Sequence, residues 1–142
     1  MRTCTDTRRC VTSGSLTPTP ELELKAEYAR IHKDGSRPIY ISGDTVWYDG
    51  VAEVAKRFKA GVVLPFAGAA QTRGPFHLTM DTNDTIETAR AFPDAVIVPV
   101  HTDGWAHFRQ GAGDLRASFD ALGFGSRLKI LEPGVATVIE PS

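Results

Sequence analysis

The stretch "IYISGDTVWYDG", residues 39–50, decides how the rest of the chain is interpreted. Residues 39–41 favour a buried strand, and Gly43 lets the chain turn directly after it. The turn leaves Asp44 at the carboxyl end of that strand. Two readings stay open here: Asp44 stabilises the turn through its own side chain, or it is held at the sheet edge to bind a cation.

Downstream of this stretch, the apolar pattern predicts strands that alternate with helices. Such alternation is typical of an α/β fold, with helices packed on a sheet. Gly61 is expected to end the first helix, and Gly123 or Gly125 the third. The predicted strands are 39–42, 62–66 and 95–100, and the predicted helices are 51–58, a segment from Thr79 or Asp81 to Phe92, and 115–122, followed by two short strands around a Pro-Gly turn in 127–140.

The part of the chain before residue 39 divides into a leader and one further strand. Residues 1–20 are polar and predicted to be a disordered leader, so the domain is assigned to 21–142. Alternating apolar residues in 21–32 favour a strand, although the Glu, Lys and Ala content also suits a helix. An Asp-Gly pair then predicts a hairpin to 39–42. Cys4 and Cys10 match no metal or redox spacing and are interpreted as free thiols.

The composition excludes several classes of function. The 142 residues suffice for one domain, and 42% are apolar, enough for a core. Sixteen Lys and Arg against seventeen Asp and Glu give a net charge of −1, which does not favour nucleic-acid binding. No apolar run approaches the ~18–20 residues that cross a bilayer, and the leader has no secretory apolar core. We therefore expect a cytoplasmic protein.

Two residues at strand ends are candidate metal ligands. Asp44 follows the strand at 39–42, and His101 follows "VIVPV" at residues 96–100. Ligands bind at the carboxyl ends of strands in α/β sheets, and carboxylate and imidazole suit zinc, iron or manganese. The alternative for Asp44 is a turn or capping residue, and for His101 a backbone hydrogen bond.

Three segments together resemble a known family. They are "YISGDTVWYDG", "LPFAGAAQTRGPFHLTMD" and "VIVPVHTDGWAHFRQG", and in this order they resemble the C-terminal half of metallo-β-lactamase-fold hydrolases of the lactonase-like branch. The resemblance implies an αββα sandwich whose sheet is mixed, with a dinuclear metal site. It also implies that Asp44 bridges the metals, that His101 is the last histidine ligand, and that His107 contacts substrate or transfers a proton. The alternative for His107 is a histidine packed in a loop.

The sequence departs from this family in its metal motif. The family pattern H-x-H-x-D-H is absent, since the histidines are His32, His77, His101 and His107. The chain is therefore expected to be inactive alone and to need a partner that supplies the first half. The reaction implied is the hydrolysis of an ester, lactone or amide of a small molecule by metal-bound hydroxide, with zinc, manganese or iron.

Other readings remain. The chain is alternatively a non-catalytic α/β interaction module that associates, with a partner or with itself, through an exposed sheet face. A complete hydrolase with Cys4, Cys10 or His32 as substitute ligands is disfavoured by their spacing. Two loop residues, His77 and Arg73, are weaker candidates near the site, since exposed histidines and solvated arginines are common in loops.

Overall fold

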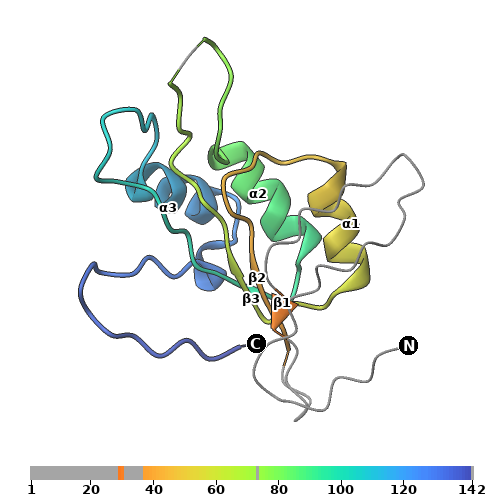
Figure 1. Cartoon of the computed structure of the whole chain (residues 1–142). Coiled ribbons are helices and arrows are strands. Elements are labelled where there is room, and N and C mark those ends of the chain that lie inside the picture. Colours follow the sequence, from red (N-terminus) through yellow and green to blue (C-terminus); the bar gives the residue numbers. More distant parts are fainter. Residues whose placement is uncertain (1–28, 31–36, 73, 142) are drawn as a thin grey trace.

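The computed structural model describes residues 29–30, 37–72 and 74–141. The strands of this part are β1 (Ala29–Arg30), β2 (Ile39–Ile41), β3 (Val62–Leu64) and β4 (Val96–Ile97). They form one sheet in the order β1-β2-β3-β4 (Figure 1). The strands β2, β3 and β4 are parallel, and β1 is antiparallel to β2, so the sheet is mixed, as predicted.

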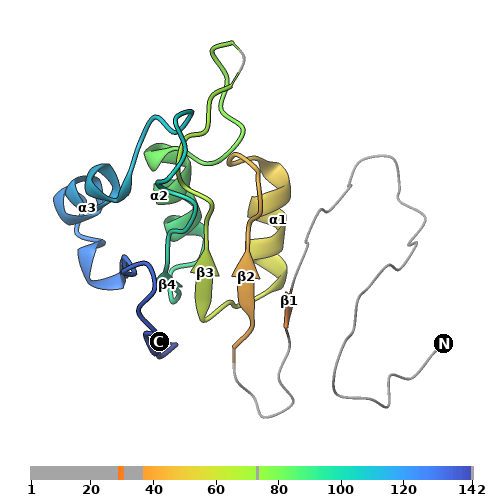
Figure 2. The ribbon, with the colours of Figure 1, turned by 60° about the vertical axis from the view of Figure 1, so that its left-hand side comes forward.

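The helices pack on one face of this sheet (Figure 2). Within the described residues they are α1 (Asp49–Arg57), α2 (Thr82–Ala91) and α3 (Ala112–Ala121), followed by the 3-10 turn η1 (Gly125–Arg127). All three α-helices contribute buried side chains to the same hydrophobic cluster. This arrangement confirms the predicted α/β class.

The register of the parallel strands explains why one face is the core. Tyr40 lies opposite Val63, and Val63 lies opposite Ile97, so the three side chains form one row that points to the helices. Tyr40 stacks on Phe92, which follows α2, with 5.3 Å between ring centroids. Burial, with a smaller contribution from Tyr48, raises the pKa of the Tyr40 phenol to about 12.

The opposite face of the sheet carries the alternate residues. Ile39, Val62 and Val96 form one row across β2, β3 and β4. Among the described residues, Leu131 and Ile139 of the C-terminal segment pack against this row. Ile39 at its end is 37% exposed. The second face is thus apolar but partly open to solvent.

Most helix boundaries follow from the sequence, and two expectations are wrong. The side chain of Asp81 caps α2 by accepting a hydrogen bond from the backbone N–H of Asp84 (2.8 Å). The first helix ends at Arg57 and not at Gly61, because its C-cap Phe58 has an extended backbone. The third helix was predicted at 115–122, but α3 ends at Ala121, and Leu122 is its C-cap and is 49% exposed.

The two strands predicted in 127–140 do not form. Leu128 makes one isolated parallel bridge with Ile97, and Lys129 donates its backbone N–H to the carbonyl of Ile97 (2.9 Å). After that point the segment crosses the second face of the sheet and contacts it through side chains. Its backbone does not lie along a strand edge, so the β-favouring residues have nothing to pair with.

Several expectations fall on residues that the structure does not describe. They are the leader at 1–20 with its two cysteines, most of the strand predicted in 21–32, and the hairpin turn that follows it. The antiparallel pairing of β1 with β2 agrees with that hairpin. No helix in the described part of the chain is long and apolar enough to span a membrane.

Candidate metal centre

Asp44 lies in the loop that follows β2, where Gly43 turns the chain with a φ of 62°. Ser42 fastens this loop to the neighbouring strand. Its backbone N–H donates to the carbonyl of Leu64 (3.1 Å), and its hydroxyl accepts from the backbone N–H of Phe66 (3.0 Å). The Asp44 side chain is 65% exposed and is therefore accessible to a ligand. The anchoring role of Ser42 was not predicted, although a serine directly after an apolar strand is a usable signal.

His101 lies in the segment that follows β4, and β3 separates β4 from β2 in the sheet. Its φ of 56° is in the left-handed region, which residues with a side chain rarely adopt and which is often found at functional sites. The imidazole packs edge-on between Phe66 and Phe108, with centroid distances of 5.1 and 4.7 Å. The backbone of Gly68 lies so close that a Cβ there would be 2.4 Å from the carbonyl oxygen of His101. These contacts fix the direction of the ring.

The fold brings Asp44 and His101 together. The Nδ1 atom of His101 is 3.4 Å from Oδ1 of Asp44. This nitrogen is buried and has no hydrogen-bond partner within the described residues. A buried polar atom without a partner is costly, so it marks a place where a further group can bind. A tetrahedral zinc with bonds of about 2.1 Å would separate two of its ligand atoms by about 3.4 Å. The two side chains therefore fit a divalent metal in both donor type and spacing.

These two ligands are fewer than a metal site needs. In the described ranges, no group of three or more His, Cys, Asp and Glu residues is arranged to hold a metal. Zinc in proteins has at least three protein ligands. Asp44 and His101 can thus provide two positions of a centre, fewer than a zinc site needs.

His107 lies near this pair but does not touch His101. Its ring contacts Trp105 on one side (5.6 Å between centroids) and Phe108 on the other (5.0 Å). Phe108 stands between the two imidazoles. The carbonyl of His107 accepts a hydrogen bond from the backbone N–H of Gln71 (2.9 Å), which joins the loops after β3 and β4. The predicted contact of His107 with substrate stays a prediction.

The other sequence candidates lie elsewhere. The Nδ1 atom of His77 is 3.5 Å from Oδ2 of Asp81, so this histidine pairs with the N-cap of α2. Arg73, His32 and the two cysteines are outside the described residues.

Two polar residues near the start of α2 were missed by sequence reasoning. Burial raises the pKa of Asp84, an effect that a hydrogen bond from the backbone N–H of Trp47 opposes. Gln110 accepts hydrogen bonds through Oε1 from the backbone N–H (2.7 Å) and the hydroxyl (2.8 Å) of Thr82. This contact ties the loop after β4 to α2. Nothing in the spacing of these residues could have indicated it.

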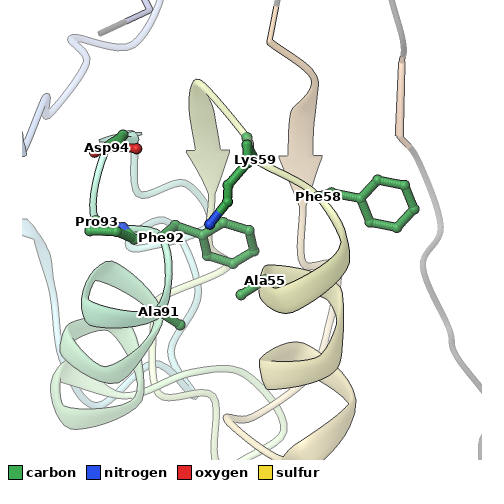
Figure 3. Close-up of a pocket in the computed structure, with 8 residues that line it drawn as sticks. Ala55, Phe58, Lys59, Ala91, Phe92, Pro93 and Asp94 are labelled. Atoms are coloured by element: carbon green, nitrogen blue, oxygen red, sulfur yellow. The ribbon is translucent and has the colours of Figure 1, made fainter.

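A small hollow lies between the C-terminal ends of α1 and α2 and includes none of the candidate site residues (Figure 3). Phe58 and Phe92 contribute to its wall, and Lys59 and Asp94 are its charged members. Its interior volume is about 10 Å³, which holds no more than one water molecule. It is too small for a substrate.

Parts of this chain are similar to known proteins. No protein-family model matches the sequence. Over 96 residues it is 28% identical to UPF0173 protein YddR of Bacillus subtilis, which covers 68% of this chain and 38% of YddR. The crystal structure of isothiocyanate hydrolase from Delia radicum gut bacteria matches with a TM-score of 0.72 and 27% identity, over 80% of this chain and 43% of that protein.

A possible metal-dependent hydrolase from Veillonella parvula matches with a TM-score of 0.65 and 29% identity, over 70% of this chain and 38% of that protein. This chain therefore spans about two fifths of the length of the proteins that it matches. The resemblance to metal-dependent hydrolases of the metallo-β-lactamase fold is confirmed.

Proposed function

We propose that this chain forms the C-terminal part of a hydrolase in which Asp44 and His101 hold a divalent metal. The observation that carries the proposal is the buried Nδ1 atom of His101, which lacks a hydrogen-bond partner in the described residues and faces the carboxylate of Asp44 at 3.4 Å. When bound, such a metal supplies Lewis acidity, which makes water a nucleophile near neutral pH. Zinc, manganese and iron all suit these donors.

The residues of this chain have separate tasks in the proposed reaction. Asp44 offsets metal charge, and its exposure leaves room for substrate. Phe66 and Phe108 hold the imidazole of His101 in one orientation and keep water from its faces. His107 binds the substrate or transfers a proton in the proposed scheme. The reaction is the hydrolysis of an ester, lactone, amide or related electrophile of a small molecule, in the cytoplasm.

The proposal requires a partner segment. The further ligands of a dinuclear centre would come from a first-half polypeptide, which would pack on the partly open second face of the sheet.

Metal titration of the purified chain tests the ligand assignment. We expect weak binding of Zn²⁺ or Co²⁺ by the native chain, because two protein ligands hold a metal less tightly than three. His101→Ala and Asp44→Asn should each abolish this binding, measured by calorimetry and by the visible spectrum of Co²⁺. His77→Ala is the matched control, since His77 also pairs with an aspartate but at the start of α2, and it should bind as the native chain does.

Either of two results would contradict the proposal. One is equal metal binding by the native chain and the His101→Ala variant. The other is a failure of the chain, mixed with the first half of YddR, to gain a metal site that depends on Asp44. In that case the second candidate function, a non-catalytic interaction module, is favoured by the apolar second face of the sheet with its partly exposed Ile39.

A further inference from the structure

Trp105 is the most exposed aromatic side chain in the described part of the chain, with 61% of its surface open to solvent. It lies in the loop that follows β4, four residues after His101. A large apolar side chain left in water next to a candidate site is a common feature of ligand-binding surfaces. The position of Trp105 therefore needs an explanation that burial in the core does not give.

A chain of rings connects Trp105 to the candidate metal ligand. The indole lies 5.6 Å from the ring of His107, His107 lies 5.0 Å from Phe108, and Phe108 lies 4.7 Å from His101. The two later contacts are edge-on, with interplanar angles of 76° and 84°. Each ring supports the next, so the indole has a fixed place relative to His101.

The backbone of this loop is also held in place. Phe108 donates its N–H to the carbonyl of Trp105 (3.1 Å), which closes a turn over the intervening residues. Gln71 and Arg109 bond the same loop to the preceding one, through the carbonyl of His107 (2.9 Å) and the carbonyl of Gly68 (3.0 Å). An exposed aromatic ring on an anchored turn loses little conformational freedom when a ligand covers it.

The charges nearby restrict the ligand. Asp44 and Asp103 bring negative charge to the two loops, and Arg109 brings one positive charge. Two negative charges against one positive charge disfavour an anionic group. A flat apolar group without negative charge avoids this penalty and stacks well on an indole face.

We infer that Trp105 is a specificity-determining residue, whose indole binds an aromatic group of the substrate, without negative charge, beside His101. The inference rests on the proposed function, because the aromatic group belongs to the substrate of that reaction. Binding of the aromatic group itself requires no metal. Its failure can therefore be separated from a failure of metal binding.

The test is an NMR titration of the full 142-residue chain with two probes in the presence of a chelator. The probes are benzyl alcohol and benzoate, which share one ring and differ in charge. We expect benzyl alcohol to bind more tightly and to shift the indole N–H signal of Trp105 and the amide signals of Gly104 and Ala106. Trp105→Ala should weaken binding of benzyl alcohol about tenfold, and Trp105→Phe should retain most of it.

The matched control is Trp47→Phe, because Trp47 packs against the core and the chain has two tryptophans. This variant should bind benzyl alcohol as the native chain does. Equal binding by the native chain and Trp105→Ala would overturn the inference, as would tighter binding of benzoate than of benzyl alcohol. Shifts centred on Phe58 and Phe92, at the hollow between α1 and α2, would also overturn it.

Discussion

Gly68 has no room for a side chain, because the backbone of His101 and the ring of Phe108 occupy that space. A Cβ at Gly68 would lie 2.4 Å from the carbonyl oxygen of His101 and 2.9 Å from Phe108. The first of these neighbours is backbone and cannot rotate away. The absence of a side chain at Gly68 therefore allows the backbone of His101, the candidate metal ligand, to take its observed position.

Gly68→Ala should disturb both stability and the candidate metal site. We expect a loss of about 1–3 kcal/mol in the free energy of unfolding, since an inserted methyl group must displace packed atoms. Denaturant unfolding measures this loss, and Co²⁺ titration should show weaker binding than in the native chain.

The matched control for this substitution is Gly113→Ala in α3. Nothing lies within 4 Å of a Cβ at Gly113, and alanine favours the helix by about 0.5–1 kcal/mol. Equal stability of the two variants would show that the space around Gly68 is not as tight as the contacts indicate.

At the scale of elements, the end of α2 depends on one side chain from a distant segment. The guanidinium of Arg127 donates to the carbonyls of Ala89 (2.8 Å), Phe92 (2.9 Å) and Pro93 (2.7 Å). Helix C-termini leave carbonyl groups without partners, and a cation there also interacts favourably with the negative end of the helix dipole. Burial lowers the pKa of Arg127, but arginine stays charged at neutral pH.

Arg127→Lys should therefore be costly although it keeps the charge. A lysine ammonium cannot reach three carbonyls in a plane, so we expect the free energy of unfolding to fall by about 2 kcal/mol. Thermal unfolding followed by circular dichroism measures it. Arg57→Lys is the comparison, because Arg57 makes an exposed ion pair with Glu53, and exposed ion pairs contribute little to stability. If both variants lose equally little, Arg127 does not hold the end of α2.

Some of these helices, strands and contacts could be predicted from the sequence, and others could not. The parallel strands and the cap at Asp81 follow from local patterns, since strand alternation and capping act over a few residues. The strands expected in 127–140 do not form, because pairing needs an edge that no local pattern supplies. Ring contacts such as that of Phe108 with His101, and the missing partner of Nδ1, depend on loops that meet only in the fold.

At the scale of the whole molecule, the sheet is covered unequally on its two faces. One face packs against α1, α2 and α3, whereas in the described residues the other contacts the C-terminal segment through Leu131 and Ile139. That segment has its own exposed apolar side chains, Val135 at 52% and Val138 at 88%. A face of this kind favours association with another polypeptide.

This asymmetry predicts self-association through the second face when no first-half partner is present. Sedimentation of the native chain should show a mass that rises with concentration. Ile39→Lys places a charge in the open row beside Val62 and should shift the chain to the monomer. Leu122→Lys is the control: Leu122 is more exposed than Ile39 but lies at the end of α3, so this variant should associate like the native chain. A native chain that stays monomeric at all concentrations, or equal effects of the two substitutions, would contradict association through this face.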